Sequence, residues 1–272
     1  MKKRVKRLLR PLAHQTLSPK TVQSLRFQWW YVSSYVPRVV SSRVRERTPR
    51  VRHFGSTVAP SLKHLQSLNL LAPTKTCRVM TRFGSDKAWN GYTPVYSALF
   101  EPRYDQPVRI LELGLGTNNE DVLSNMGVFG APGASLRGWR QMFPHANVYG
   151  ADIDRGILFE EDRIKTFQCD QLDQDSIRKL WSRPELQGGA DIIIEDGLHT
   201  LEANISFMEG SLRHLRPGGT YVTEDIGWDT FDEFFKQLET VYAKQYPNYE
   251  FAFVTLSERG YNNMLVVRRA AE

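Results

Sequence analysis

Acidic side chains, two glycines and a histidine recur after short apolar runs in this 272-residue chain. In chain order, the residues at these positions are Glu112, Gly114, Gly116, Asp152, Asp154, Asp170, Gln171, Glu195, Asp196, His199, Glu224 and Asp225. Carboxylates bind hard cations and accept hydrogen bonds from hydroxyl groups, and a histidine can take up a proton near neutral pH. If the fold brings these side chains together, they could hold a hydroxylated ligand, a divalent cation, or both.

The apolar runs alternate with amphipathic segments, and this pattern predicts alternating strands and helices. The expected strands are residues 108–111, 147–153, 164–168, 191–194 and 220–223. The expected helices are residues 134–143, 174–181, 201–215 and 230–245, and residues 249–256 and 262–269 are expected to form an antiparallel hairpin. We therefore expect an α/β fold with a Rossmann-like, doubly wound and mostly parallel sheet. Ligands of such sheets bind at the carboxyl ends of the strands, where the polar residues above are located.

Gly114 and Gly116 follow the first expected strand in the stretch VRILELGLGT, residues 108–117. Glycines at this position let a ligand approach the backbone closely. A dinucleotide site would have a third glycine and an acid ~20 residues further on. Here the third glycine is absent, and Asp152 lies 36 residues after Gly116. The pattern favours a zwitterionic ligand that carries adenosine: Asp152 would accept from the ribose hydroxyls, Asp170 from the adenine amino group, and the glycines would admit the amino-acid portion.

Four longer motifs lie in the same part of the chain. They are FGSDKAWNGYTPVY (residues 83–96), ASLRGWRQMFPHANVYGADI (134–153), IIIEDGLHT (192–200) and GGTYVTEDI (218–226). Together they resemble the class I S-adenosylmethionine-dependent methyltransferases, over about residues 82–269. Within that class they are similar to the metal-dependent sugar O-methyltransferases of macrolide biosynthesis, of the mycinamicin and tylosin type, and to cephalosporin hydroxylase-like sequences.

The resemblance implies S-adenosylmethionine and Mg²⁺ as cofactors, and a hydroxyl of a sugar or a glycosylated small molecule as the acceptor. By the family's motif, Asp196, Glu224 and Asp225 would bind Mg²⁺, and His199 would act beside Asp196 as the catalytic base. The residues expected to contact the cofactor are Glu112, Gly114, Gly116, Asp152, Asp170, Gln171, Lys87 and Tyr92, of which the last two would close over its amino-acid end.

The chain departs from the family's pattern at two places. Its loop after Gly116 is longer, and the usual Asp-Asp-Gly-Ser-His is Glu-Asp-Gly-Leu-His at residues 195–199. The longer loop would alter the acceptor pocket. Leu198 removes a hydroxyl but leaves the expected metal ligands and the expected base in place.

Charge divides the chain into two unequal parts. Residues 1–52 contain 14 of the 36 Lys and Arg residues and one of the 30 acids, so they carry +13 and the remainder carries −7. We expect a basic, partly helical extension over residues 1–75 and a methyltransferase domain over residues 76–272. The extension could lie on an anionic membrane surface, follow the phosphates of a nucleic acid, serve as a transit peptide, or pack on the body or on another subunit of a homo-oligomer.

The sequence also limits where the protein is expected to act. No apolar run reaches the ~18 residues of a membrane span, and no apolar region of a signal peptide follows the basic start. Cys77 and Cys169 are far apart, lack metal-type spacing and indicate a reducing compartment. We therefore expect a cytoplasmic protein. It could be free in the cytoplasm or in peripheral contact with the inner face of a membrane.

Two other functions stay open from the sequence alone. One is an RNA methyltransferase guided by the basic segment, although nothing in residues 76–272 resembles an RNA-reading module and no catalytic cysteine motif is present. Nucleic acid is therefore the less favoured partner. The other is a protein of the same fold that binds the cofactor without turnover.

Overall fold

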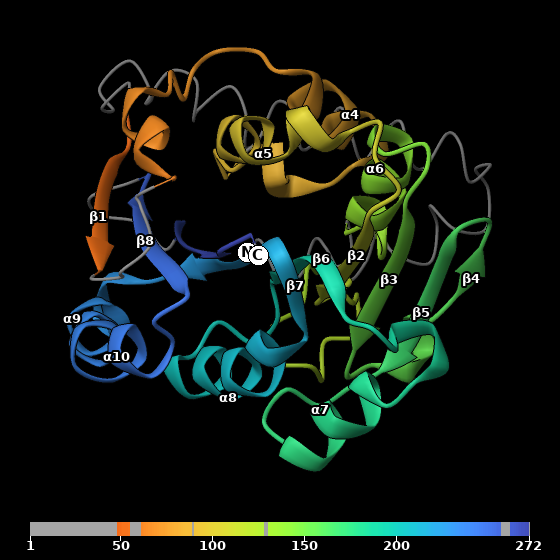
Figure 1. Cartoon of the computed structure of the whole chain (residues 1–272). Helices are drawn as coiled ribbons and strands as arrows, with labels where there is room; N and C mark the ends of the chain where they lie inside the picture. The colour runs from red at the N-terminus through yellow and green to blue at the C-terminus, as the bar shows by residue number, and fades with distance from the viewer. Residues whose placement is uncertain (1–47, 55–60, 89, 128–129, 257–261, 272) are drawn as a thin grey trace, which may run out of the picture.

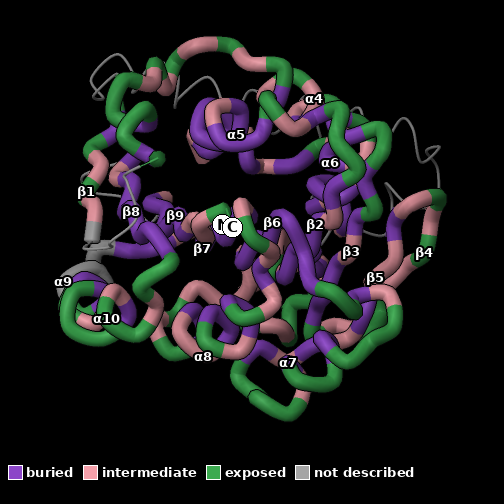
Figure 2. Tube along the Cα trace, viewed as in Figure 1, coloured by how far each residue is buried: buried purple, intermediate pink, exposed green. Residues whose placement is uncertain are grey.

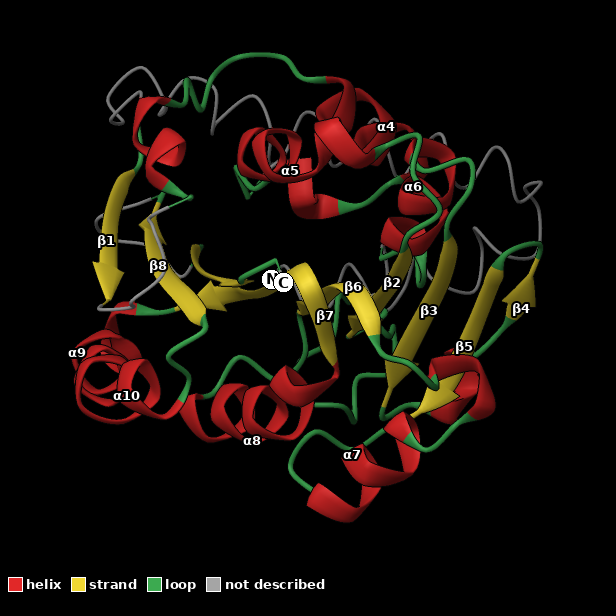
Figure 3. Cartoon of the chain, viewed as in Figure 1, coloured by secondary structure: helices red, strands yellow, loops and turns green. Residues whose placement is uncertain are grey.

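The structure, a computed structural model, describes residues 48–54, 61–88, 90–127, 130–256 and 262–271. Nine strands within these residues form one sheet in the order β1-β8-β9-β7-β6-β2-β3-β5-β4. Figures 1 and 3 show the sheet running across the molecule between two layers of helices. Helices α4, α5 and α6 cover one face, and α7, α8 and α9 cover the other.

The centre of the sheet is parallel and its edges are antiparallel. The strands are β1 (Arg50–Phe54), β2 (Arg109–Leu113), β3 (Asn147–Asp152), β4 (Glu160–Glu161), β5 (Ile164–Gln168), β6 (Ala190–Glu195), β7 (Leu215–Ile226), β8 (Tyr249–Thr255) and β9 (Asn263–Arg269). Neighbours among β7, β6, β2, β3 and β5 are parallel, whereas β9, β8, β1 and β4 pair antiparallel with their neighbours. The carboxyl ends of the five parallel strands therefore share one edge.

The helices precede β2, connect the parallel strands, or lie between β7 and β8. They are α4 (Lys75–Phe83), α5 (Thr93–Phe100), α6 (Ala134–Met142), α7 (Gln174–Trp181), α8 (Leu201–Ser211), α9 (Trp228–Gln237) and α10 (Ala243–Gln245), with short 3₁₀ turns that include η2 (Lys63–Ser67) and η3 (Asp86–Ala88). Thr200 starts α8 by accepting a hydrogen bond from the Ala203 N–H at 3.3 Å, so a capping residue directly follows the EDGLH turn.

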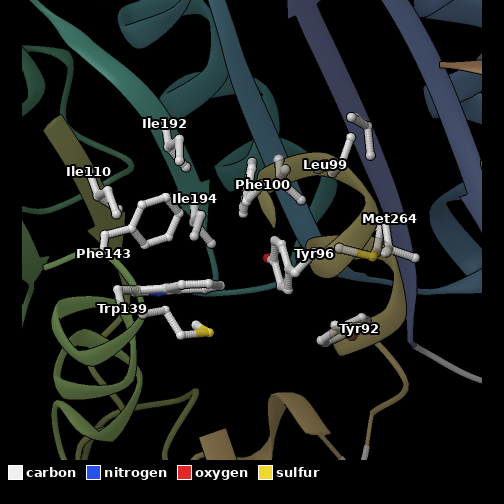
Figure 4. Packing of buried hydrophobic residues seen from close by; sticks show 14 of the residues in the cluster. Tyr92, Tyr96, Leu99, Phe100, Ile110, Trp139, Phe143, Ile192, Ile194 and Met264 are labelled. Carbon is white, nitrogen blue, oxygen red and sulfur yellow. The ribbon is translucent and has the colours of Figure 1, made fainter. Parts of the chain in front are cut away.

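Two apolar cores form on the two faces of the sheet because successive strand side chains point in opposite directions. Ile192 and Ile194 of β6 pack with Phe100, Tyr96 and Trp139 under α5 and α6, as Figure 4 shows. The residues between them in the strand face the other core, which includes residues of α7, α8 and α9. In Figure 2 the central strands are almost wholly buried, which explains why they are apolar runs.

The structure confirms the expected fold class and places every expected strand and helix within a few residues of its predicted bounds. The hairpin of β8 and β9 is also confirmed. Strand β1 and helices α4 and α5 were not predicted. Nearly every residue of α5 is buried, so TPVYSALF has no polar stripe from which a helical period could be recognised. Residues 216–219 lie near the start of β7, where its pairing with β6 shifts register.

Part of the predicted extension packs on the sheet. Strand β1 pairs antiparallel with β8, and Leu62 before η2 and Leu65 within it belong to the core under α5. Residues 1–47, which hold most of the predicted basic extension, lie outside the described residues, and the division at residue 75 stays a prediction. Among the helices of the described residues, none is long and apolar enough to cross a bilayer.

Candidate functional site

Strand register sorts the acids at the carboxyl edge onto the two faces of the sheet. Glu112 of β2 lies beside Ile194 of β6, which lies beside Val222 of β7. Side chains alternate along a strand, so Asp196 and Glu224, two residues after Ile194 and Val222, lie on the same face as Glu112. This face is covered by α5 and α6. Three carboxylates from three strands therefore meet on one side of the sheet.

The glycine turn after β2 is built around Asp152 at the end of β3. Gly114 has φ +89°, and a Cβ atom there would lie 1.9 Å from the carbonyl oxygen of Asp196, so only glycine fits. Asp152 accepts from the Leu115 N–H at 2.7 Å with one oxygen and from the Asp154 N–H at 2.9 Å with the other. Burial raises the pKa of Asp152. This carboxylate therefore holds the turn against the following strand.

A cavity of about 590 Å³ opens above this edge. Its lining includes Lys87, Gly114, Gly116, Asp152, Asp170, Gln171, Asp196, His199 and Asp225. Three of the exposed large apolar side chains of the described residues, Leu123, Ile153 and Leu172, also line it. Exposed apolar groups around a polar cavity are suited to hold the flat or apolar parts of a ligand.

Lys87, on η3, lies at the centre of the carboxylates. Its Nζ atom donates to Asp196 Oδ2 at 2.7 Å and to Glu224 Oε1 at 2.8 Å, and lies 3.5 Å from Glu112 Oε1. Burial alone would lower the pKa of Lys87, but the charges of Asp196, Glu112 and Glu224 outweigh burial and raise it well above its usual value. The side chain is only 1% exposed, so the ion pairs are buried. Lys87 therefore stays protonated and joins the ends of three strands.

Two tyrosines complete this buried set. The hydroxyl of Tyr92 donates to Asp225 Oδ1, and that of Tyr96 donates to Glu224 Oε1. Both hydroxyls have a pKa well above the usual value, because burial and the neighbouring carboxylates disfavour the phenolate. The two hydroxyls therefore keep their protons and act as hydrogen-bond donors that orient Asp225 and Glu224.

His199, in the loop between β6 and α8, faces Asp225 near the end of β7. His199 Nε2 lies 3.8 Å from Asp225 Oδ2 and 4.0 Å from Asp196 Oδ1. Ligand atoms of Asp196, His199 and Asp225 lie within 4.8 Å of one another and could hold a metal ion. His199 and Asp225 also have positive φ values of 61° and 54°, which are uncommon for residues other than glycine and cluster at functional sites.

Burial and the close packing of acidic side chains raise the pKa values of several of them. Burial, followed by the charge of Asp196, raises the pKa of Asp225 to about 6 and that of Glu224 well above its usual value. Desolvation, then the same charge, raises the pKa of Asp86, which also lines the cavity. Carboxyl groups that resist ionisation together indicate a site with more negative charge than Lys87 balances.

Glu195 belongs to a different cluster on the opposite face. Its Oε1 accepts from Gln171 Nε2 at 3.1 Å, and with the Asn204 nitrogen oriented toward it, Oε2 accepts at 3.2 Å. Gln171 Oε1 in turn accepts from the Leu198 N–H at 2.8 Å. A Cβ atom on Gly197 would collide with Gln171 at 1.8 Å. Burial raises the pKa of Glu195 to about 7. Gln171 therefore braces the turn that carries His199.

No protein-family model matches the chain. Among curated proteins, it is 35% identical over 157 residues to the 8-demethyl-8-(2-methoxy-alpha-L-rhamnosyl)-tetracenomycin-C 3'-O-methyltransferase of Streptomyces olivaceus, which covers 57% of this chain and 37% of that protein. It is 36% identical over 141 residues to the mycinamicin VI 2''-O-methyltransferase of Micromonospora griseorubida, covering 52% of this chain and 32% of that protein. The chain thus spans about a third of the length of the curated relatives it matches.

Solved structures of a related methyltransferase also match the fold of this chain. The MycE methyltransferase from the mycinamycin biosynthetic pathway, in complex with Mg and SAH, matches with a TM-score of 0.55 and 25% identity, over 74% of this chain and 56% of that one. Its complex with Mg, SAH and mycinamycin VI matches with a TM-score of 0.54 and 26% identity, over 75% and 56% of the two chains. The resemblance to the class I S-adenosylmethionine-dependent methyltransferases is confirmed.

The methyltransferase fold brings most of the predicted site residues to one cavity. Gly114, Gly116, Asp152, Asp170, Gln171, Lys87, Asp196, His199 and Asp225 line it, and Asp154 does so as well. Glu112, Tyr92 and Glu224 are not among its lining residues. The carboxylate of Glu112 accepts from Ser135 and Trp139 of α6, and Tyr92 and Glu224 are engaged as described above. These three residues therefore shape the wall of the cavity from behind.

Sequence reasoning missed Tyr96, Asp86 and the role of Gln171 as a brace. Tyr92 and Tyr96 are four residues apart, the spacing that places side chains on one side of a helix, and this was the available signal. Lys87 was expected over the amino-acid end of the cofactor. The structure places its ammonium among carboxylates beside the cavity that Lys87 lines, and the contact with the cofactor stays a prediction.

Proposed function

We propose that the protein is an S-adenosylmethionine-dependent and Mg²⁺-dependent O-methyltransferase that acts on a hydroxyl of a sugar or a glycosylated small molecule. The observation that carries the proposal is the shared cavity, whose lining holds both the glycine turn with Asp152 and the cluster of Asp196, His199 and Asp225. The relatives named as sugar O-methyltransferases, and the MycE complexes with Mg and SAH, support it.

The residues around the glycine turn fit the methyl donor. Each oxygen of Asp152 accepts one backbone N–H, and each keeps a lone pair for a ribose hydroxyl. Ile153 and Leu172 are exposed apolar side chains of the lining, beside Asp152 and Gln171 in the chain, and they suit an aromatic base. Asp170 would accept a hydrogen bond from the adenine amino group. The two glycines would admit the amino-acid portion of the cofactor.

The residues of the carboxylate cluster fit Mg²⁺, which prefers oxygen ligands and keeps places for water or substrate. Asp196 and Asp225 offer such oxygens within 4.8 Å of each other. Glu224 is the third proposed ligand. Its Oε1 already accepts from Lys87 and Tyr96, so the oxygen it would offer is Oε2. His199 Nδ1 is buried with no hydrogen-bond partner among the described residues, so a bound group could satisfy it.

The chain's own residues would position the acceptor and take its proton. His199 Nε2, beside Asp196 and Asp225, would remove the proton from a sugar hydroxyl held at these carboxylates. Mg²⁺, when bound, would hold two neighbouring hydroxyls and favour the alkoxide. The glycine turn would fix the donor at the other side of the cavity. Holding the two reactants in line supplies much of the rate in such a displacement.

The test is transfer of the labelled methyl group of S-adenosylmethionine to a panel of glycosides and sugar nucleotides, with product detected by mass spectrometry. We expect transfer with Mg²⁺, loss of it with a chelator, and a fall of more than about 100-fold in His199→Ala. His145→Ala removes an exposed histidine outside the cavity lining and is the matched control. Transfer indifferent to both the chelator and His199→Ala would reject the proposed chemistry.

We propose in addition that the basic residues 1–52 bring the protein into peripheral contact with an anionic membrane. The charge contrast supports this, since these residues carry +13 and the rest of the chain −7. This proposal is independent of the chemistry in the cavity.

A further inference from the structure

We infer that Lys87 is a resident cation of the carboxylate cluster, which holds the cluster together before Mg²⁺ binds and weakens the binding of that ion. The inference rests on the proposed function, because it concerns the proposed metal site. It assigns Lys87 a positioning role in place of the predicted contact with the cofactor.

The ammonium of Lys87 is surrounded by carboxylates: it donates hydrogen bonds to Asp196 and Glu224 and forms an ion pair with Glu112. An ammonium has three N–H donors and no acceptor. Three carboxylate oxygens surround Nζ, those of Asp196 at 2.7 Å, Glu224 at 2.8 Å and Glu112 at 3.5 Å. Two of the three donors are thus engaged by Asp196 and Glu224, and the third carboxylate beside Nζ is that of Glu112. The geometry therefore favours a structural cation over a ligand contact.

Lys87 is also the only lysine or arginine of the described residues that pairs with these carboxylates. Among the ion pairs of the described residues, no other lysine or arginine reaches Glu112, Asp196 or Glu224. Glu112 and Glu224 are at most 1% exposed, so water cannot screen their charges well. Without the ammonium, buried carboxylates from three neighbouring strands would repel one another, and the carboxyl edge of the sheet would lose stability.

The same position makes Lys87 a competitor of the metal ion. Asp196 belongs both to the group that could hold a metal ion and to the ion pair with Lys87. A divalent cation on Asp196 would lie within a few ångströms of the ammonium, and repulsion between them is weakly screened in this buried setting. Lys87 thus lowers the affinity for Mg²⁺ and keeps the cluster ordered in its absence.

The experiment compares the full wild-type chain with Lys87→Met, which keeps an unbranched side chain of similar length and removes the charge. Mg²⁺ binding is measured by titration calorimetry, and thermal unfolding is followed with and without Mg²⁺. For Lys87→Met we expect a Kd for Mg²⁺ at least about tenfold lower, from the loss of one buried like charge. We also expect a lower Tm without metal and a larger rise in Tm when Mg²⁺ is added.

Lys87→Met/Glu112→Gln is the matched variant, since it removes one positive and one negative charge. A glutamine side chain in place of Glu112 can still accept from Trp139 and donate to Ser135, so local bonding is kept. We expect the double variant to regain most of the metal-free Tm and an Mg²⁺ affinity close to that of the wild type. If Lys87→Met does not fold even with Mg²⁺, the test is the Tm of the double variant Lys87→Met/Glu112→Gln. A double variant that also fails to fold would overturn the inference.

The other outcomes are distinguishable. Equal Kd values and equal Tm responses for wild type and Lys87→Met would overturn the inference while leaving the proposed metal site intact. Failure of both proteins to bind Mg²⁺ would overturn the metal site and the inference together. Loss of S-adenosylhomocysteine binding in Lys87→Met, with Mg²⁺ binding unchanged, would return Lys87 to the cofactor contact that the sequence predicted.

Discussion

Gly114 shows how a single absent Cβ atom shapes the cavity. Its φ of +89° and the Asp196 oxygen 1.9 Å from a Cβ position both exclude other residues. We expect Gly114→Ala to lower the free energy of unfolding by about 3 kcal/mol or more, because backbone must move, and to abolish binding of S-adenosylhomocysteine. Denaturant unfolding and calorimetry measure the two effects.

Gly91→Ala is the control for Gly114→Ala. Gly91 has a similar φ of +85°, but nothing lies within 4 Å of a Cβ atom there. Gly91→Ala should lower the free energy of unfolding only by the strain of a left-handed backbone, about 1–2 kcal/mol. Equal destabilisation by the two substitutions would show that contact with Asp196 does not matter.

The pKa of Asp225, raised to about 6 by burial and then by Asp196, gives metal binding a pH dependence. Protons compete with the metal for this carboxyl around and below pH 6, so Mg²⁺ affinity should rise with pH, by about fivefold between pH 5 and 6, and level off above about pH 7. Calorimetry at pH 5, 6, 7 and 8 measures this.

The sign for stability is opposite to that for metal binding. The folded protein holds this proton more tightly than the unfolded chain, so the group's contribution to stability is full below its ordinary pKa of 3.8 and is lost as pH rises through about 6. The metal-free protein should therefore lose this contribution over the range in which it gains affinity for Mg²⁺. Metal affinity that is flat from pH 5 to 8 would contradict the assignment of Asp225.

At the scale of the element, β6 carries an aspartate near each end, and the two have different roles. Asp196 follows the carboxyl end and lines the cavity. Asp191, near the amino end, pairs with Arg103 at 3.0 Å and Arg216 at 3.2 Å and accepts from the Arg109 N–H at 2.8 Å. The second aspartate thus ties β6 to β2 and β7 at the edge away from the ligand.

We expect Asp191→Asn to lower the free energy of unfolding by about 1–3 kcal/mol, because the arginines lose their charged partner, and to leave cofactor and Mg²⁺ binding unchanged. Asp196→Asn should have the opposite pattern: it should weaken Mg²⁺ binding and change the free energy of unfolding less than Asp191→Asn does. Denaturant unfolding and calorimetry on both variants give the comparison, and a loss of ligand binding in Asp191→Asn would contradict the division of roles.

The central parallel strands could be predicted from sequence because they contain buried apolar runs that both helical layers cover, as in residues 192–194. The convergence of Asp152, Asp196 and Asp225 also followed from topology, since ends of parallel strands share an edge. The roles of Glu112 and Lys87 could not be predicted. They depend on which atoms of α6 and η3 reach the strand ends, and no local pattern encodes such contacts.

At the scale of the whole molecule, basic residues are concentrated at the start of the chain and acidic residues in the remainder. Residues 1–47 hold 12 of the 36 basic residues and one acid, and so carry +11. Strand β1 begins at Arg50 and pairs with β8, so a chain that starts at residue 48 keeps every strand of the described sheet. We therefore expect the shortened protein to fold and to bind S-adenosylhomocysteine and Mg²⁺ as the full chain does.

The shortened protein should differ from the full chain in membrane binding. Each basic residue near an anionic surface contributes about 1 kcal/mol, so the full chain should sediment with phosphatidylserine-containing vesicles and the chain from residue 48 should not. Binding should fall steeply with salt and should be absent on neutral phosphatidylcholine vesicles, which are the matched control. Equal sedimentation of the two proteins would refute the membrane role of the basic residues, and binding of RNA in place of vesicles would assign their charge to phosphate in a nucleic acid. Because the cavity and the basic residues belong to separate parts of the chain, either result leaves the proposed chemistry to be judged by its own tests.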